Sequence, residues 1–170
     1  MHGDLGTRGL AGGPADMAGG QFEDQVCAYY LAHLVAESAG GPPAGVPAQP
    51  IAVWRQAALA ADDIVVETRE GGAAYVLAKL TLRLEQRPES ALGKPLGSFG
   101  KLARQCAGDT GARPWERPLD PAVDRFVIAI GASSSREAMH RLNQLADITR
   151  QHVSWRECER VLTSAQEHAS

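Results

Sequence analysis

The glycine pair at positions 71 and 72, set between two apolar runs, constrains the fold of this chain more than any other feature. The run before it, "DIVVE", covers residues 63–67, and the run after it, "AAYVLAKLTL", covers residues 73–82. β-Branched and aromatic residues favour strands, and a Gly-Gly turn suits the tight connection of a β-hairpin. With "IAVWRQAAL" at residues 51–59 as a further strand, the sequence predicts a meander of three strands.

Helical patterns surround this meander. Phe22, Val26 and Leu34 recur at helical spacing, and the Gly and Pro residues from Gly40 onward end that pattern. Residues 98–106 predict a helix with Ser98 as N-cap, and residues 124–131 predict an apolar strand buried on both faces. Residues 134–148 predict a helix opened by Ser134 and Glu137 as a capping box, and residues 154–169 predict a last helix opened by Ser154. The predicted class is α/β, a mixed sheet flanked by helices, with α+β as the alternative.

Composition and charge indicate a globular domain and argue against a membrane protein. Hydrophobic residues make up 44% of the 170 residues, which suits one globular domain, and the formal net charge of -3 gives no overall attraction to nucleic acid or anionic membrane. No apolar run reaches the roughly 18 residues of a membrane span. Cys27, Cys106 and Cys158 stand far apart without a CxxC pair, which is typical of a reducing compartment. We therefore expect a cytoplasmic protein with no membrane partner.

The N-terminal residues have a composition of their own. Residues 1–19 are rich in Gly and Ala and show no periodicity, which predicts a disordered tail. They also lack the charged-then-apolar order of a signal peptide. The expected organisation is this tail followed by one domain over residues 20–170.

Glu23, Asp63 and Lys79 form the strongest chemical pattern. Asp63 opens one predicted strand and Lys79 lies inside the next, so the hairpin would make them neighbours on the sheet. A carboxylate at a strand start can hold a divalent cation, and an adjacent lysine can orient water and stabilise charge that grows on a phosphorus centre. In the simpler interpretation, Asp62 and Asp63 form a turn and Lys79 extends from an edge strand into water.

The order of these motifs resembles the PD-(D/E)xK restriction-endonuclease-like superfamily. It is most similar to the double-stranded DNA nuclease domain of bacterial antiphage effectors, both CD-NTase-associated and fused to STAND NTPases. The similar segments are "GGQFEDQVCAYYLAHLV", "DDIVV" at 62–66, "VLAKLT" at 76–81 and "DRFVIAIG". The resemblance extends from about residue 20 to the C-terminus and implies a restriction-endonuclease-like fold.

The resemblance also implies roles for individual residues. Asp63 and Glu23 would hold Mg²⁺, for which Mn²⁺ could substitute, and Lys79 would be the catalytic lysine. The substrate would be double-stranded DNA, cleaved by phosphodiester hydrolysis in antiphage defence. An NTPase or sensor module, in the same or another chain, and a homo-oligomer are further partners that the resemblance allows.

Leu77 departs from the family pattern, which has Glu, Asp or Gln two residues before the lysine. Leucine offers no oxygen to a metal, and Mg²⁺ requires oxygen ligands. The alternative function is therefore a catalytically inactive module that binds DNA or protein. From the sequence alone, Glu or Gln at position 77 should restore the missing ligand.

Basic residues gather after the third predicted strand. Arg83, Lys94, Lys101 and Arg104 are predicted to contact the DNA backbone. The serine-rich loop at residues 131–137, "GASSSRE", opens a helix, so it could either cradle a phosphate or simply cap that helix.

Overall fold

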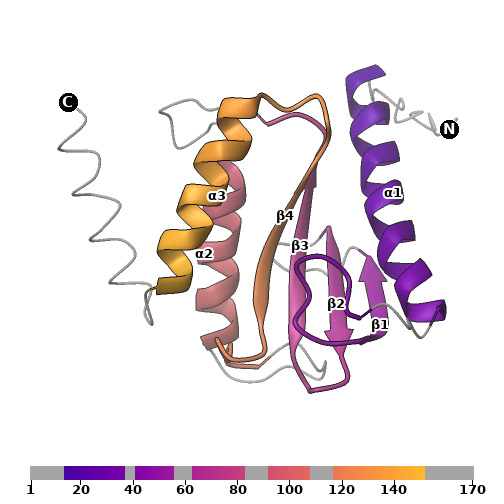
Figure 1. The fold of residues 1–170 in the computed structure, drawn as a ribbon, viewed down its shortest axis with the longest axis vertical. Coiled ribbons are helices and arrows are strands. Elements are labelled where there is room, and N and C mark those ends of the chain that lie inside the picture. The colour runs from indigo at the N-terminus through magenta and orange to yellow at the C-terminus, as the bar shows by residue number, and fades with distance from the viewer. Residues whose placement is uncertain (1–13, 37–40, 56–62, 83–91, 108–116, 152–170) are drawn as a thin grey trace, which may run out of the picture.

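A four-stranded sheet with helices on both faces forms the protein in a computed structural model, which describes residues 14–36, 41–55, 63–82, 92–107 and 117–151 (Figure 1). The elements are α1 (Pro14–Val35), β1 (Pro50–Arg55), β2 (Ile64–Thr68), β3 (Ala73–Lys79), α2 (Gly93–Ala107), β4 (Arg125–Ile130) and α3 (Arg136–Gln151). Their order follows the order predicted from the sequence. The last predicted helix lies outside the described residues.

The sheet is mixed, in the order β1-β2-β3-β4. The first three strands are antiparallel neighbours, and β4 pairs in parallel with β3, with Ala74 opposite Arg125 and Lys79 opposite Ile130. Helix α2 lies between β3 and β4 in the chain and makes the crossover that two parallel strands require. The predicted meander and the coarse class, a mixed α/β sheet with flanking helices, are confirmed.

The hairpin between β2 and β3 depends on its two glycines. Gly71 has a φ of 77°, which L side chains rarely adopt. At Gly72 a Cβ atom would clash with the Val123 carbonyl of the loop before β4. The Thr68 hydroxyl closes the turn, because it donates to the Gly72 carbonyl at 3.1 Å and accepts from the Gly72 N–H at 3.2 Å. The same turn therefore sets the register of the hairpin and fixes its distance from the loop before β4.

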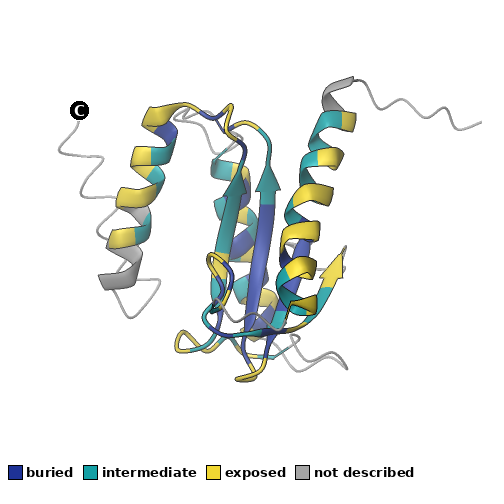
Figure 2. Ribbon diagram, turned by 45° about the vertical axis from the view of Figure 1, so that its right-hand side comes forward, coloured by how far each residue is buried: buried dark blue, intermediate teal, exposed yellow. Residues whose placement is uncertain are grey.

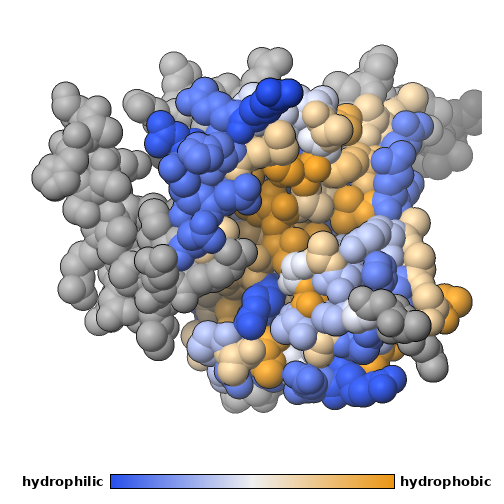
Figure 3. Space-filling view, in the orientation of Figure 1, coloured by the Kyte–Doolittle hydropathy of each residue, from blue (hydrophilic) through white to orange (hydrophobic). Residues whose placement is uncertain are grey.

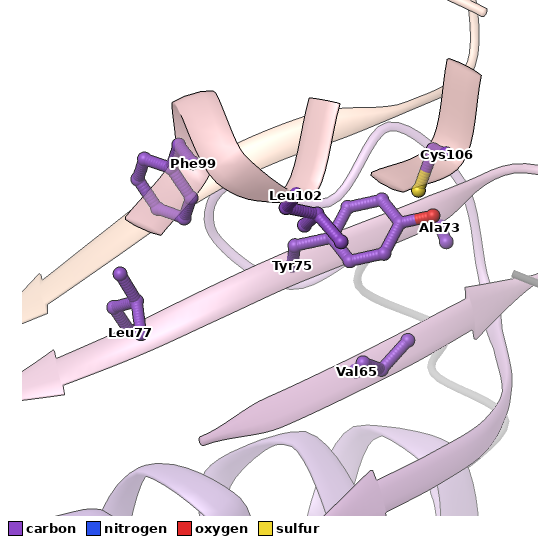
Figure 4. Packing of buried hydrophobic residues seen from close by; sticks show 7 residues of the cluster. All are labelled: Val65, Ala73, Tyr75, Leu77, Phe99, Leu102 and Cys106. Atoms are coloured by element: carbon purple, nitrogen blue, oxygen red, sulfur yellow. The ribbon is translucent and has the colours of Figure 1, made fainter. Parts of the chain in front are cut away.

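Figure 2 shows the buried residues concentrated on the central strands, and each face of the sheet has its own apolar cluster. Cys27 and Tyr30 of α1 pack on the face that carries Ile64, Val66 and Val76. On the other face, helix α2 covers the side chains of alternate residues, as Figure 4 shows; this cluster is Val65, Ala73, Tyr75, Leu77, Phe99, Leu102 and Cys106. Burial raises the pKa of Tyr30 to about 12 and also raises the pKa of the Cys27 thiol. Cys27 and Cys106 are buried core residues.

A bidentate ion pair holds the loop before β4 against the hairpin. Arg117 donates from Nη1 and Nη2 to the two carboxylate oxygens of Asp124, each at 2.8 Å, and Nη2 also donates to the Gly71 carbonyl. The buried Asp124 carboxylate accepts further hydrogen bonds from the Ala73 and Asp120 N–H groups. The hydrogen bond to Asp124 raises the pKa of Arg117 above its ordinary value. The two segments are thereby joined through one carboxylate.

Several predicted boundaries and burials differ from the structure. Helix α1 begins at Pro14, so the predicted disordered tail over residues 1–19 includes residues 14–19 of this helix. Helix α2 begins at Gly93, so Ser98 lies within the helix and is not its N-cap. Strand β4 is only half-buried and Phe126 is 44% exposed, because in the described part of the chain β4 pairs with β3 alone and forms an edge.

The cap of α3 is Ser135, one residue later than predicted. Its hydroxyl accepts from the Ala138 N–H at 3.1 Å, and its carbonyl accepts the first helical hydrogen bond, from Met139. Ser134 instead accepts from the Leu82 N–H. Among the described helices, none combines the length and apolar character needed to cross a membrane.

Candidate functional site

The structure brings Asp63 and Lys79 together. Asp63 immediately precedes β2, and Lys79 is the last residue of β3 on the neighbouring strand. The Oδ2 atom of Asp63 accepts a hydrogen bond from the Ala78 N–H at 2.8 Å and lies 3.5 Å from Lys79 Nζ. The side chain of Asp63 is 19% exposed and that of Lys79 is 36% exposed. A partly buried carboxylate and an ammonium thus share one end of the sheet.

In this arrangement the Asp63 carboxylate can still bind a cation and the Lys79 ammonium can still donate hydrogen bonds. The printed contacts of Asp63 with described residues all use Oδ2, so within this part of the chain Oδ1 remains for a cation. The Ala78 N–H fixes the other oxygen through the backbone, which holds the carboxylate in place without a flexible partner. The Lys79 ammonium has three donors, of which an ion pair with one oxygen uses one. The site can therefore present a cation-binding oxygen beside a positive hydrogen-bond donor.

Glu23, the third predicted site residue, has a different partner. Its Oε1 atom lies 3.0 Å from Nη2 of Arg55, whose Nη1 lies 2.7 Å from Asp24 Oδ1. Helix α1, which carries Glu23, packs on the face of Val76, whereas Lys79 belongs to the opposite face by strand alternation. In the described ranges, no group of three His, Cys, Asp or Glu side chains could hold a metal ion. The described residues do not assemble Glu23 and Asp63 into a multi-ligand metal centre.

Leu77 lies on the Lys79 face, because alternate residues of a strand share a face, but it is part of the core. Its side chain is 4% exposed and belongs to the cluster beneath α2, together with Phe99 and Leu102. Figure 4 shows it among apolar neighbours. The leucine therefore has a packing role that the sequence comparison did not reveal.

We expect Leu77→Glu to destabilise the protein by about 3–5 kcal/mol, because it places a carboxylate in an apolar cluster without a partner. This differs from the expectation that a ligand at position 77 simply restores a metal site. Leu77→Met, which keeps apolar volume, should cost less than about 1.5 kcal/mol. Urea unfolding of both variants measures the difference; equal midpoints would contradict the core role of Leu77.

The predicted DNA contacts lie on one helix, apart from Arg83, which is outside the described residues. Lys94, Lys101 and Arg104 are exposed on α2 and recur with Gly97 at three- and four-residue spacing, so they follow one side of the helix. Figure 4 shows Phe99 near Leu77 and Cys106 near Ala73, so α2 runs antiparallel to β3. The first turn of α2, which holds Lys94, therefore lies toward the Lys79 end of the sheet.

The serine hydroxyls of the loop after β4 form hydrogen bonds with other residues of the protein. Ser133 Oγ donates to the Leu80 carbonyl at 2.9 Å and lies 3.1 Å from the Thr81 hydroxyl. Ser134 and Ser135 bind the Leu82 and Ala138 N–H groups, respectively. These bonds tie the segment after β3 to the start of α3. The structure thus favours the capping interpretation of this loop over the phosphate-cradle interpretation.

Two groups near the site were missed by sequence reasoning. The Ala78 N–H orients Asp63, and backbone donors leave no mark in a residue pattern. Arg55 neutralises Glu23 from a strand end 32 residues away, and only the pairing of α1 with β1 could have indicated it. No protein family, curated protein or solved structure matches this chain.

Proposed function

We propose that this chain hydrolyses DNA phosphodiesters with the help of a divalent metal, Mg²⁺ or Mn²⁺, through Asp63 and Lys79. The observation that carries the proposal is the Asp63–Lys79 contact at the end of two adjacent strands. A mixed sheet with helices on both faces, in the predicted order of elements, supports a restriction-endonuclease-like fold. A cytoplasmic antiphage effector that acts on double-stranded DNA is the setting that the family resemblance suggests.

The described residues fit a loosely held metal. Asp63 supplies one carboxylate oxygen, and Mg²⁺ sites often consist of one or two carboxylates, several waters and substrate phosphate oxygens. Glu23 pairs with Arg55 and belongs to the helix on the opposite face of the sheet, so it is not part of this set. When bound, the metal would polarise the scissile phosphate and lower the pKa of a bound water.

Lys79 would act directly on the reacting groups. Its ammonium can orient the attacking water and stabilise the negative charge that develops on the phosphate oxygens. The contact with Asp63 keeps this ammonium at the site before substrate arrives, so the electrostatic arrangement is already present. The chain thereby holds one anionic and one cationic group in place at the end of the sheet.

Helix α2 would bind the phosphate backbone. Replacing Lys94, Lys101 or Arg104 singly with alanine should weaken DNA binding about equally for all sequences and lower the slope of log K against log salt by about one unit. A titration over several salt concentrations measures this slope. An unchanged slope in the triple variant would show that the stripe is an ordinary solvated surface.

A second function is favoured by two specific contacts. Leu77 occupies the core where the family has a ligand, and Arg55 pairs with Glu23. Both would suit a catalytically inactive module that binds DNA or a partner protein.

A cleavage assay separates the two functions. Supercoiled plasmid should be nicked or degraded in Mg²⁺ or Mn²⁺ and remain intact with a chelator. DNA binding without cleavage in either metal would favour the inactive module. Intact plasmid in both metals would also contradict the proposed hydrolysis of DNA.

A further inference from the structure

Trp54 lies on the same face of the sheet as Asp63 and Lys79. It pairs across the strands with Val65 of β2, whose side chain belongs to the cluster beneath α2. Its neighbour Val53 packs on the opposite face, as strand alternation requires. Asp63 precedes Val65 by two residues, so alternation places it on the face of Trp54, where it contacts Lys79. Asp63 is therefore the diagonal cross-strand neighbour of Trp54, and such a neighbour lies within reach of an aromatic side chain.

Helix α2 leaves the side chain of Trp54 accessible. In the same row across the sheet, Val65 and Tyr75 are fully buried beneath α2, whereas Trp54 is 45% exposed. The strand that carries Trp54, β1, is the outermost strand on this side of the described sheet. A large aromatic ring in this position can present its face to a planar group next to Asp63.

The surface between α1 and α3 has a different character. Figure 3 shows it to be mainly hydrophobic. Such a surface binds apolar groups, whereas the phosphates of a nucleic acid bind cations and hydrogen-bond donors. Of these two places, the end of the sheet that carries Asp63 and Lys79 is the better match for a nucleotide.

We propose that Trp54 stacks on an unpaired base beside the phosphate at Asp63 and Lys79, so that the substrate is DNA with a single-stranded stretch. This inference rests on the proposed function, which places the phosphate. The base and the phosphate of a nucleotide are attached to one sugar, so diagonal neighbours on a sheet can contact both. Stacking on an indole suits any sequence, because every base has a π-face.

The same contact excludes an intact duplex at this position. Paired bases are stacked on one another inside the double helix, and a protein reaches the face of a base only where it is unpaired or turned out of the stack. Trp54 on the surface of β1 would thus direct cleavage to unpaired nucleotides. The family resemblance alone suggests duplex DNA without this restriction.

The test measures the affinity for a short thymidine oligonucleotide and for its fully abasic counterpart, with a chelator present so that no strand is cut. We expect Trp54→Ala to bind the thymidine oligonucleotide about 5- to 150-fold more weakly than the wild type, the range for stacking of one base on an aromatic ring. Its affinity for the abasic oligonucleotide should be unchanged. Trp54→Phe keeps a ring and should retain part of the difference. Fluorescence anisotropy of labelled oligonucleotides gives the affinities, and Tm reports whether each variant is folded.

Ile51→Ala is the matched control. Ile51 belongs to the same strand and is 51% exposed, but it lies toward the other end of β1. This variant should bind both oligonucleotides as the wild type does.

Three outcomes would overturn the proposal. If Trp54→Ala weakens binding of both oligonucleotides equally, or of neither, the indole only packs on the sheet. If the wild type binds duplex DNA but not the thymidine oligonucleotide, the site does not recognise an unpaired base. Loss of the proposed hydrolysis is a separate result: intact plasmid in Mg²⁺ and Mn²⁺, together with base-dependent binding through Trp54, would contradict the cleavage and leave the stacking site in place.

Discussion

Replacing Asp124 with alanine should destabilise the protein by roughly 3 kcal/mol, the lower end of the range for breaking a buried ion pair. The Asp124 side chain is 5% exposed and bonds Arg117 together with the N–H groups of Ala73 and Asp120. Its loss would leave buried donors without an acceptor. The Arg117 side chain keeps 26% of its surface in water, which moderates the cost. Urea unfolding monitored by circular dichroism measures the change.

The matched control is Asp120→Ala. Asp120 is exposed, and the hydrogen bond that its side chain accepts within the described residues comes from the nearby Ala122 N–H. Its replacement should cost no more than about 1 kcal/mol. If the two variants unfold at the same urea concentration, the ion pair with Arg117 contributes little, and the hairpin is held to the loop by packing at Gly72 instead.

The hairpin and the order of the elements could be predicted because their causes are local. Apolar runs and a glycine pair specify two strands and a turn through backbone preference alone, and Gly71 indeed has a positive φ. The meeting of Asp63 and Lys79 followed from the same hairpin, since a tight turn fixes which residues are neighbours. The Asp63–Lys79 part of the candidate site was therefore accessible from the sequence.

The predictions that the structure contradicts, and the partners that sequence reasoning missed, depend on contacts between distant segments. The exposure of Phe126 depends on β4 being a sheet edge among the described residues, and an apolar run alone does not show which strand is outermost. Ser134 and Ser135 compete for the same capping role, and the bond of Ser134 to Leu82 decides between them. Arg55 binds Glu23 through the packing of α1 on β1. Tertiary partners of this kind outweigh local patterns.

Lys79→Ala should reduce DNA cleavage by roughly 10²–10³-fold, as for removal of a single well-placed electrostatic group in other enzymes. The reason is that the ammonium beside Asp63 is the only part of the contact that can donate hydrogen bonds to a phosphate or a water. Stability should change by less than about 1 kcal/mol, because a pair this exposed contributes little to folding. Asp63 should keep its position, since the Ala78 N–H still holds Oδ2. Initial rates of plasmid nicking, together with Tm, measure both quantities.

Arg141→Ala provides the control for this prediction. Arg141 is an exposed cation on α3, so its loss changes the net charge equally without touching the site. Cleavage should then be close to that of the wild type. A loss of cleavage in Lys79→Ala with unchanged Tm and unchanged DNA affinity would place Lys79 in the chemical step. Equal rates for the wild type, Lys79→Ala and Arg141→Ala would mean that the lysine only pairs with Asp63, and that the cleavage arises elsewhere in the preparation or the chain.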